Sequence, residues 1–116
     1  MRACYNISGA CYASLGQLDS AVKRYEKAID IKPDYADAHN NLAITFQELG
    51  QLDAAVKSYE QALVFKPDYA EAHNNLGGTL QDLGQLDESI KSLKKALVIK
   101  PDYPEAYYNL GNALKE

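Results

Sequence analysis

The sequence predicts an all-α solenoid in which antiparallel helix pairs stack in series, as three full repeats followed by one extra helix. Two observations support this prediction. Pro33, Pro67 and Pro101 follow one another at intervals of 34 residues, a period typical of helical repeat architectures. Between these prolines, apolar residues recur three or four positions apart, which places them on one face of an α-helix.

A short turn separates the two helices of each predicted pair. The sequence Leu-Gly-Gln-Leu-Asp occurs at residues 15–19, 49–53 and 83–87. Glycine adopts the left-handed backbone conformation that ends many helices, so Gly50 and Gly84 are predicted to end the first helices of their pairs. Asp53 and Asp87 follow closely, and we expect them to cap the second helices.

Two apolar patterns define the packed faces of the predicted helices. The first helices carry Ala38, Leu42, Phe46 and Leu49, then Ala72, Leu76, Leu80 and Leu83. The second helices carry Ala55, Tyr59 and Ala62, then Ser89, Leu93 and Ala96. Each second helix ends at a Lys-Pro-Asp segment, because the residue before proline avoids the α conformation. Asp68 and Glu71 then have the spacing of a capping box, which predicts the start of the next helix.

Together these patterns resemble the signature of the tetratricopeptide repeat family. The matching segments are Tyr12...Ala21-x3-Tyr25-x2-Ala28...Pro33, Leu42-Ala43-x2-Phe46...Ala55-x3-Tyr59-x2-Ala62...Pro67 and Leu76-Gly77-x2-Leu80...Ser89-x3-Leu93-x2-Ala96...Pro101. The chain departs from the family pattern where His39, His73 and Tyr107 replace a favoured tryptophan. Ser89 also replaces a small alanine, and Ser8 replaces a leucine in the first repeat.

The resemblance implies a single domain, residues 1–116, coiled as a right-handed superhelix. Its repeats are expected at 2–35, 36–69 and 70–103, with a C-terminal half repeat at 104–116. Small residues stand where paired helices must approach closely, at Gly9, Ala43, Gly77 and Gly111 in the first helices and at Ala28, Ala62 and Ala96 in the second. A larger side chain at such a position would overpack the contact and cost about 1 to 3 kcal/mol.

The resemblance also implies that the first helix of each pair lines the concave side of the solenoid, where we expect binding. Beside their apolar stripe, these helices carry a second stripe that is rich in amides and acids. The candidate peptide-binding residues are Asn40, Asn41, Ile44, Glu48, Asn74, Asn75, Gln81, Asp82, Tyr108, Asn109 and Asn112.

Asn41, Asn75 and Asn109 occupy equivalent positions and are predicted to form a row. Stacked helices lie about 10 Å apart and an extended peptide advances about 3.3 Å per residue, so the row would meet every third residue of a bound strand. A primary amide can pair with a peptide N–H and C=O together. The repeats look similar to those of O-GlcNAc transferase-like proteins, where such a ladder holds substrate chains. The alternative is that these asparagines are solvated residues copied by duplication.

The resemblance raises one further comparison. Chaperone-binding members of the family hold the tail carboxylate of their partner with a clamp of Lys, Asn and Arg. The matching positions here are Asn6, Ala10, Asn41, Glu71 and Asn75. Only Asn41 fits, and Glu71 would repel a carboxylate, so chaperone-tail binding is not expected.

Charge and composition narrow the classes of partner. The formal net charge is -4 and the lysines are scattered, so nucleic acid is not expected, and a neutral or basic peptide or protein is favoured over an acidic one. The sequence contains no run of about 18 apolar residues that could span a membrane, and its start lacks the pattern of a secretory signal. Cys4 and Cys11 are too far apart along one predicted helix to form a disulfide. The expected location is the cytoplasm.

No sequence pattern predicts a catalytic site, a metal site or a cofactor. His39 and His73 lie one period apart, roughly 10 Å when their helices stack, which is too far to share one zinc ion. We therefore expect both to be packing residues. Gly77 and Gly78 lie inside a helical pattern with no Lys-Ser or Lys-Thr after them, unlike a phosphate-binding loop. The chain is predicted not to be an enzyme.

The predicted function is a non-catalytic interaction module that binds an extended peptide or a partner protein in its concave groove. One alternative is a self-assembling scaffold, a homo-oligomer joined through its terminal helices, because Leu110, Ala113 and Leu114 keep an internal-repeat pattern at the last helix. Another alternative is that the chain is the repeat part of a larger enzyme, such as a glycosyltransferase with these repeats. The sequence does not identify the partner, organism, pathway or oligomeric state.

Overall fold

The computed structural model describes residues 17–115, where every regular element is an α-helix. The helices are α2 (Leu18–Ile31), α3 (Ala36–Glu48), α4 (Leu52–Phe65), α5 (Ala70–Asp82), α6 (Leu86–Ile99) and α7 (Pro104–Lys115). The predicted first helix, with Asn6, Gly9 and both cysteines, lies outside the described residues. Within residues 17–115, none of the helices combines the length and the apolar character needed to cross a bilayer.

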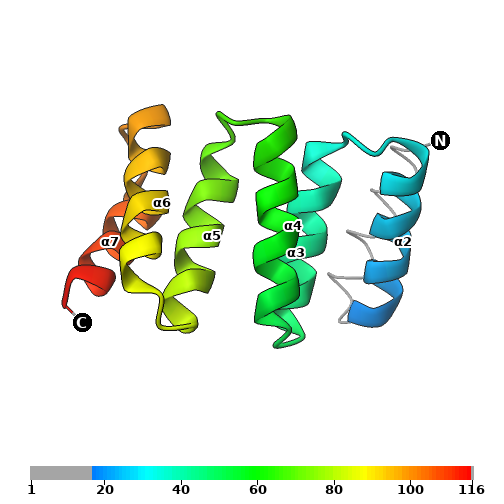
Figure 1. Ribbon diagram of the computed structural model, residues 1–116, viewed down its shortest axis with the longest axis horizontal. Coiled ribbons are helices and arrows are strands. Elements are labelled where there is room, and N and C mark those ends of the chain that lie inside the picture. Colours follow the sequence, from blue (N-terminus) through cyan, green and yellow to red (C-terminus); the bar gives the residue numbers. More distant parts are fainter. Residues whose placement is uncertain (1–16, 116) are drawn as a thin grey trace.

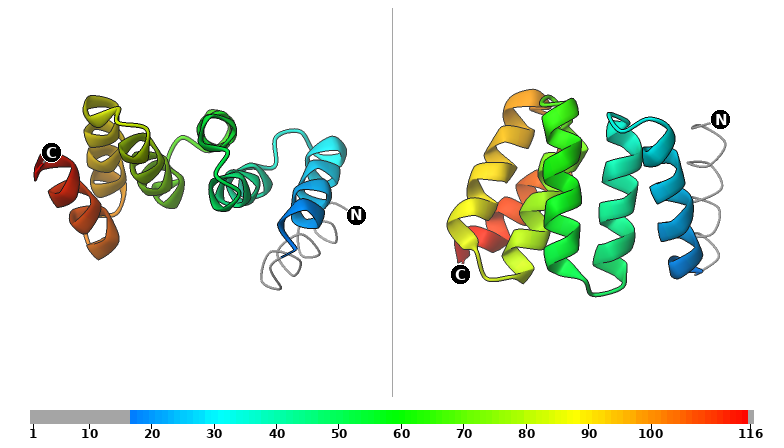
Figure 2. Two further views of the ribbon diagram at one scale, coloured as in Figure 1. Left: turned by 90° about the horizontal axis from the view of Figure 1, so that it is seen from below. Right: turned by 45° about the vertical axis from the view of Figure 1, so that its right-hand side comes forward.

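The helices alternate between two layers (Figure 1). α3, α5 and α7 form one layer, and α2, α4 and α6 form the other. In the left view of Figure 2, the layer of α3, α5 and α7 follows the inner side of a shallow arc. Each helix packs on the next one in sequence, and inner-layer neighbours also touch, α3 with α5 and α5 with α7. The architecture is therefore the predicted solenoid of antiparallel helix pairs.

The predicted turn glycines end the inner helices. Gly50 and Gly84 both have a φ of 79°, the left-handed conformation that strains any residue with a side chain. After Gly50, the backbone N–H of Gln51 donates to the carbonyl of Phe46 over 2.8 Å, and the N–H of Gly50 donates to the carbonyl of Gln47. This hydrogen-bond pair satisfies carbonyls at the end of α3 and directs the chain into α4.

The predicted N-caps are wrong. α4 begins after Gln51, so Asp53 lies inside its first turn and makes no capping hydrogen bond, and α6 repeats this arrangement. At the start of α5 the N-cap position belongs to Tyr69, so Asp68 and Glu71 form no capping box. An acidic residue in the first turn still stabilises the helix, because it faces the positive end of the helix dipole. The spacing of acidic residues in the sequence does not distinguish an N-cap from an acidic residue in the first helical turn.

The small residues allow the paired helices to approach closely, as predicted for the second and third pairs. Ala43 and Ala62 are completely buried. A Cβ atom added to Gly77 would lie 2.6 Å from Cγ of Leu93, closer than the two atoms could pack. Gly111 is different, because a Cβ atom there would meet nothing within 4 Å. Within the described residues no second helix covers this face of α7, so the predicted close contact at Gly111 is absent.

Candidate functional site

The inner surface is built from one face each of α3, α5 and α7, where equivalent positions recur in each repeat. Three predicted site residues are exposed there, Glu48, Asp82 and Tyr108, and Tyr108 is 71% exposed. Six more are half-buried: Asn41, Ile44, Asn75, Gln81, Asn109 and Asn112. We call these nine residues the inner surface. All nine are accessible to a ligand, and their role in binding remains a prediction.

Asn40 and Asn74 do not belong to this accessible surface, contrary to the sequence-based prediction. They are only 4% and 2% exposed. Nδ2 of Asn40 lies 3.4 Å from the hydroxyl of Tyr69, and Oδ1 of Asn74 accepts a hydrogen bond from Nδ2 of Asn109 over 3.0 Å. The first contact joins α3 to the residue that precedes α5, and the second joins α7 to α5. The prediction failed because helical periodicity cannot distinguish an amide that faces solvent from one that faces a neighbouring helix.

The contact between Asn40 and Tyr69 is buried and incompletely satisfied. Oδ1 of Asn40 has no hydrogen-bond partner in the described part of the chain. Burial raises the pKa of Tyr69, and the hydrogen bond and negative charge of Asp37 raise it further. Tyr69 is therefore a neutral hydrogen-bonding group between α3 and the start of α5.

Members of the predicted asparagine row are engaged differently. Asn109 uses one N–H of its amide to hold Asn74 on the neighbouring helix. Within the described residues, the side chain of Asn75 makes no hydrogen bond, so its carbonyl and both its N–H groups are available. The row thus has a role that neither sequence-based hypothesis included, since one of its members also links successive repeats.

Gln47 links three helices beneath the inner surface, and the sequence-based site did not include it. Its Oε1 accepts hydrogen bonds from the hydroxyls of Tyr59 and Thr79, at 2.8 and 3.0 Å. Tyr59 and Thr79 are completely buried, and burial raises the pKa of Tyr59 so that it remains a donor. Thr79 is 32 residues from Gln47 in the sequence, so no local pattern could have revealed this contact.

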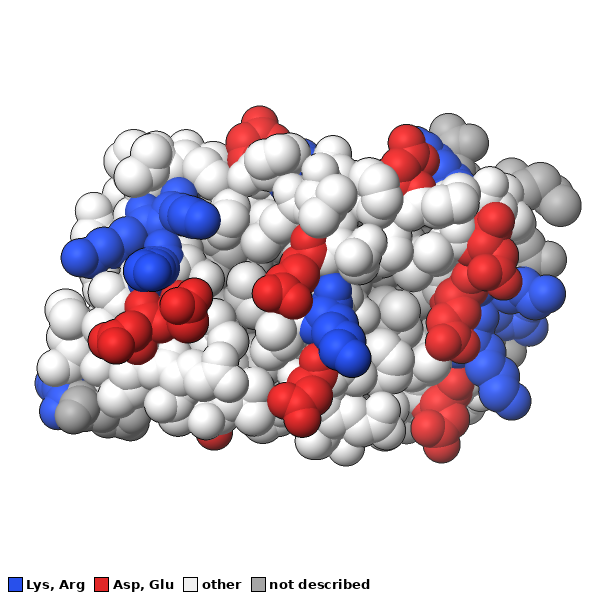
Figure 3. All heavy atoms as spheres, viewed as in Figure 1, with Lys and Arg blue, Asp and Glu red and all other residues white. Residues whose placement is uncertain are grey.

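The inner-layer helices carry mostly acidic charge. The exposed carboxylates are Asp37, Glu48, Glu71, Asp82 and Glu105. Within α3, α5 and α7 the one cationic side chain is Lys115, at the end of α7. The opposite face differs, because acidic and basic side chains are interspersed over α2, α4 and α6 (Figure 3). The negative charge is therefore concentrated on the inner layer.

Both histidines are packing residues, as predicted. Nε2 of His39 donates to the carbonyl of Pro33 over 2.8 Å, and Nε2 of His73 donates to the carbonyl of Pro67 over 2.9 Å. Burial lowers the pKa of His73. The positive charge of Lys95 lowers this pKa further, whereas the hydrogen bond to the carbonyl of Pro67 raises it. Among residues 17–115, no group of three or more histidine, cysteine or acidic side chains could hold a metal ion.

A stack of helix pairs with an accessible inner surface rich in amides and acids defines a protein-interaction module of the helical-repeat class. A family model described as TPR repeat matches residues 9–50, 45–84 and 79–116, which together cover nearly the whole chain. The chain belongs to the tetratricopeptide repeat family. No curated protein matches it.

Several solved structures share this fold. The first TPR of Spaghetti (RPAP3) bound to the HSP90 peptide SRMEEVD is 23% identical, with a TM-score of 0.96 over 98% of this chain and 90% of that chain. The second TPR domain of human RPAP3 in complex with the HSP70 peptide SGPTIEEVD is 21% identical, with a TM-score of 0.92 over 100% of both chains. The Arabidopsis OM64 TPR domain is 22% identical, with a TM-score of 0.95 over 99% and 95%. At these identities the likeness establishes the fold.

Proposed function

We propose that this chain binds an extended peptide, or an extended segment of a partner protein, along its inner surface. The observation that supports this most strongly is the accessible amide of Asn75, which makes no side-chain hydrogen bond within the described residues. Asn41 and Asn109 lie at the equivalent positions of the neighbouring repeats. Amides in such a row pair with peptide backbone groups and tolerate many side chains, so the site would recognise an extended conformation more than a sequence.

The charge of the inner layer supports a neutral or basic partner. The two RPAP3 structures contain peptides that end in Glu-Glu-Val-Asp. In the present chain Glu71 stands at a position where a chaperone-tail clamp carries a basic residue, and Glu48 and Asp82 are also exposed. These carboxylates would repel an acidic tail, so we do not extend the chaperone ligands to this protein. A cytoplasmic location agrees with a peptide-binding role and remains a prediction.

A more specific form of this proposal is that these repeats are similar to those of O-GlcNAc transferase-like proteins and bind their ligands in the same way. It rests on the asparagine row, the feature for which the sequence resembles those repeats. In this form of the proposal the chain is the repeat part of a larger protein. The repeats select substrates and a separate domain performs catalysis.

Selection from a random peptide library displayed on phage tests the proposed function. We expect enriched peptides that are poor in Asp and Glu and that bind Asn75→Ala at least about tenfold more weakly, because several backbone hydrogen bonds depend on that amide. Gln61→Ala is the matched control, since Gln61 is an exposed amide on outer helix α4. Equal binding to both variants, or enrichment of acidic peptides, would refute the proposal.

Self-assembly is the competing function. Its structural support is the exposure of apolar side chains on the last helix, where Leu114 is 63% and Tyr107 is 56% exposed. Light scattering at several concentrations separates the two functions. A mass that grows with concentration would support a scaffold, whereas a monomer at the highest concentration would eliminate it.

A further inference from the structure

A groove with a volume of about 520 Å³ lies between α4 and α6, in the outer layer of the solenoid (Figure 1). Each wall is one face of a helix: Glu60, Leu63 and Val64 on α4, and Lys95, Val98 and Ile99 on α6. Val64 is 65% and Val98 is 80% exposed. Because α4 and α6 each have further helices before and after them, we call this feature the outer groove and treat it as part of the stacked repeats.

The equivalent groove between α2 and α4 has a different chemical character. Asp30 occupies the position there that Val64 occupies in the outer groove, and Gln61 occupies the position of Lys95. Relative to its neighbour, the outer groove has therefore lost a carboxylate and gained an ammonium group. It combines an apolar surface with a positive charge, and the groove between α2 and α4 does not.

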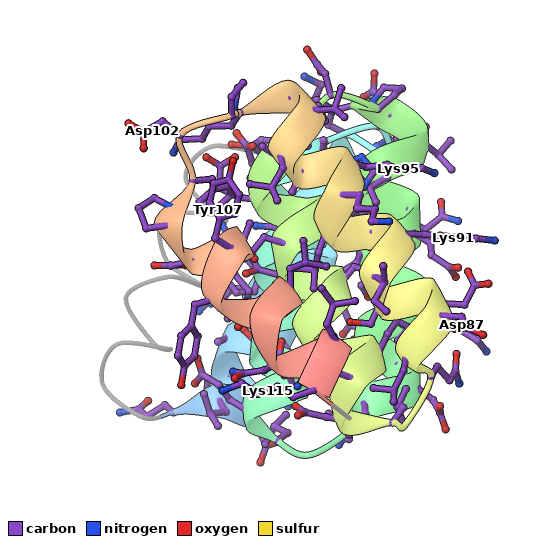
Figure 4. All side chains as sticks on the ribbon, turned by 90° about the vertical axis from the view of Figure 1, so that its left-hand side faces the viewer. Asp87, Lys91, Lys95, Asp102, Tyr107 and Lys115 are labelled. Carbon is purple, nitrogen blue, oxygen red and sulfur yellow. The ribbon has the colours of Figure 1, made fainter. Side chains whose placement is uncertain are left out.

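Lys95 and Glu60 give the two walls of the outer groove opposite charges. Both side chains are exposed, and within residues 17–115 neither forms an ion pair. Lys95 extends from α6 on the side away from α7 (Figure 4). Basic side chains gather on α6 beside an uncharged area of the surface (Figure 3). A carboxylate on a ligand is therefore complementary to the α6 wall, whereas Glu60 would repel it from the α4 wall.

We propose that the outer groove binds an extended peptide segment in which an aliphatic side chain and an acidic side chain are two positions apart. The aliphatic side chain lies between Val64 and Val98, and the carboxylate pairs with Lys95. Side chains two positions apart in a strand share one face and are about 6.6 Å apart. Lys95 and Val98 are separated by about 4.5 Å along the helix axis, and the flexible lysine side chain covers the difference.

The outer groove and the inner surface would have different ligands. The inner-layer helices carry exposed carboxylates, so an acidic peptide is disfavoured there and favoured in the outer groove. Because the two sites lie on different layers of the solenoid, one chain can bind two peptides at once. The inference does not depend on the function proposed for the inner surface.

The synthetic peptide Ser-Gly-Ile-Ser-Glu-Gly-Ser is the direct probe. Titrated into the isotope-labelled full chain, it is expected to shift the amide signals of Val64 and Val98 in a saturable way, with a dissociation constant of about 1 mM. Such binding is too weak for enrichment from a displayed library, so the test of the inner surface is not affected. The same peptide with lysine in place of glutamate should bind at least about fivefold more weakly, because its charge would meet Lys95.

Two substitutions give the outer groove the residues of its neighbour. Val64→Asp is expected to weaken binding of the glutamate peptide at least about tenfold, because a charge would replace the aliphatic contact. Lys95→Gln should weaken it about two- to fivefold, the range for an exposed ion pair. Both positions are exposed, so both variants are expected to fold. Lys94→Gln is the matched control, since Lys94 is exposed on α6 but does not line the groove, and it should leave binding unchanged.

The proposal would be overturned by the absence of shifts at Val64 and Val98, by equal binding of the two peptides, or by unchanged binding to Val64→Asp. Shifts of these two signals with phosphatidylserine vesicles, and none with the glutamate peptide, would also overturn it, because the groove would then contact a membrane surface. The amide signal of Asn75 reports the inner surface separately, so failure of one site is distinguishable from failure of the other.

Discussion

The side-chain amide of Asn109 on α7 donates a hydrogen bond to Oδ1 of Asn74 on α5 over 3.0 Å. Asn109 is half-buried at the inner surface, whereas Asn74 is 2% exposed. The contact therefore connects a candidate ligand-binding residue to the interior between two repeats. In a solenoid, where each repeat is stabilised by its neighbours, such a contact affects both stability and binding.

Asn109→Ala is expected to lower the free energy of unfolding by about 1 to 3 kcal/mol, because Oδ1 of Asn74 would lose its partner while remaining buried. Urea denaturation followed by circular dichroism measures the change. Asn112→Ala is the control, since Asn112 lies on the same helix and its side chain makes no hydrogen bond within the described residues. It should change stability by about 0.5 kcal/mol or less. Equal effects of the two substitutions would contradict a structural role for the Asn109 amide.

The same substitution at two equivalent glycines should have opposite effects. Gly77→Ala is expected to destabilise the fold by about 1 to 3 kcal/mol, because the new methyl group would collide with Leu93. Gly111→Ala is expected to stabilise it by about 0.5 to 1 kcal/mol, because alanine favours the helix and meets no neighbour. Thermal unfolding of both variants tests this. If both were destabilised alike, α7 would already be covered in solution.

Acid should weaken the fold partly through His73. Burial lowers its pKa below the ordinary value of 6.5, so the unfolded chain binds a proton more readily than the folded chain. This contribution to stability is complete above pH 6.5 and is lost as the pH falls below that value. We expect His73→Gln to lose less stability than the original chain between about pH 7.5 and pH 5. The difference between the urea midpoints of the two proteins at each pH measures the contribution of His73. An identical pH dependence of the two proteins would contradict this contribution.

Much of the fold could be predicted from the sequence because each repeat contains the turn glycine, the small residues and the apolar pattern that determine its packing. The 34-residue period, Gly50 and the small residue at Gly77 all correspond to the observed turn and close contact. Helix starts were harder, because an aspartate can cap a helix or stabilise its first turn, and Asp53 does the second. The predicted close contact at Gly111 failed, because periodicity assumes a neighbour that the described residues do not contain.

The candidate site was predictable only in outline. A helical pattern places Asn40 and Asn41 on one side of α3, but their environments depend on the curvature and on the neighbouring helix. Asn40 is therefore buried against Tyr69 while Asn41 is half-buried at the inner surface. Gln47 was missed for the same reason, since its partner Thr79 comes from the next repeat. Polar contacts between repeats are specified by three-dimensional stacking, which a single helix does not encode.

The proposed function requires that ligands bind along α3, α5 and α7. Its most direct test is an amide chemical-shift map of the isotope-labelled chain, titrated with a neutral or basic peptide selected from the library. The largest saturable shifts are expected at Asn41, Asn75 and Asn109, and they should weaken together in Asn75→Ala. Shifts confined to the outer helices α4 and α6, with Asn75 unaffected at saturation, would show that ligands do not bind along the inner surface.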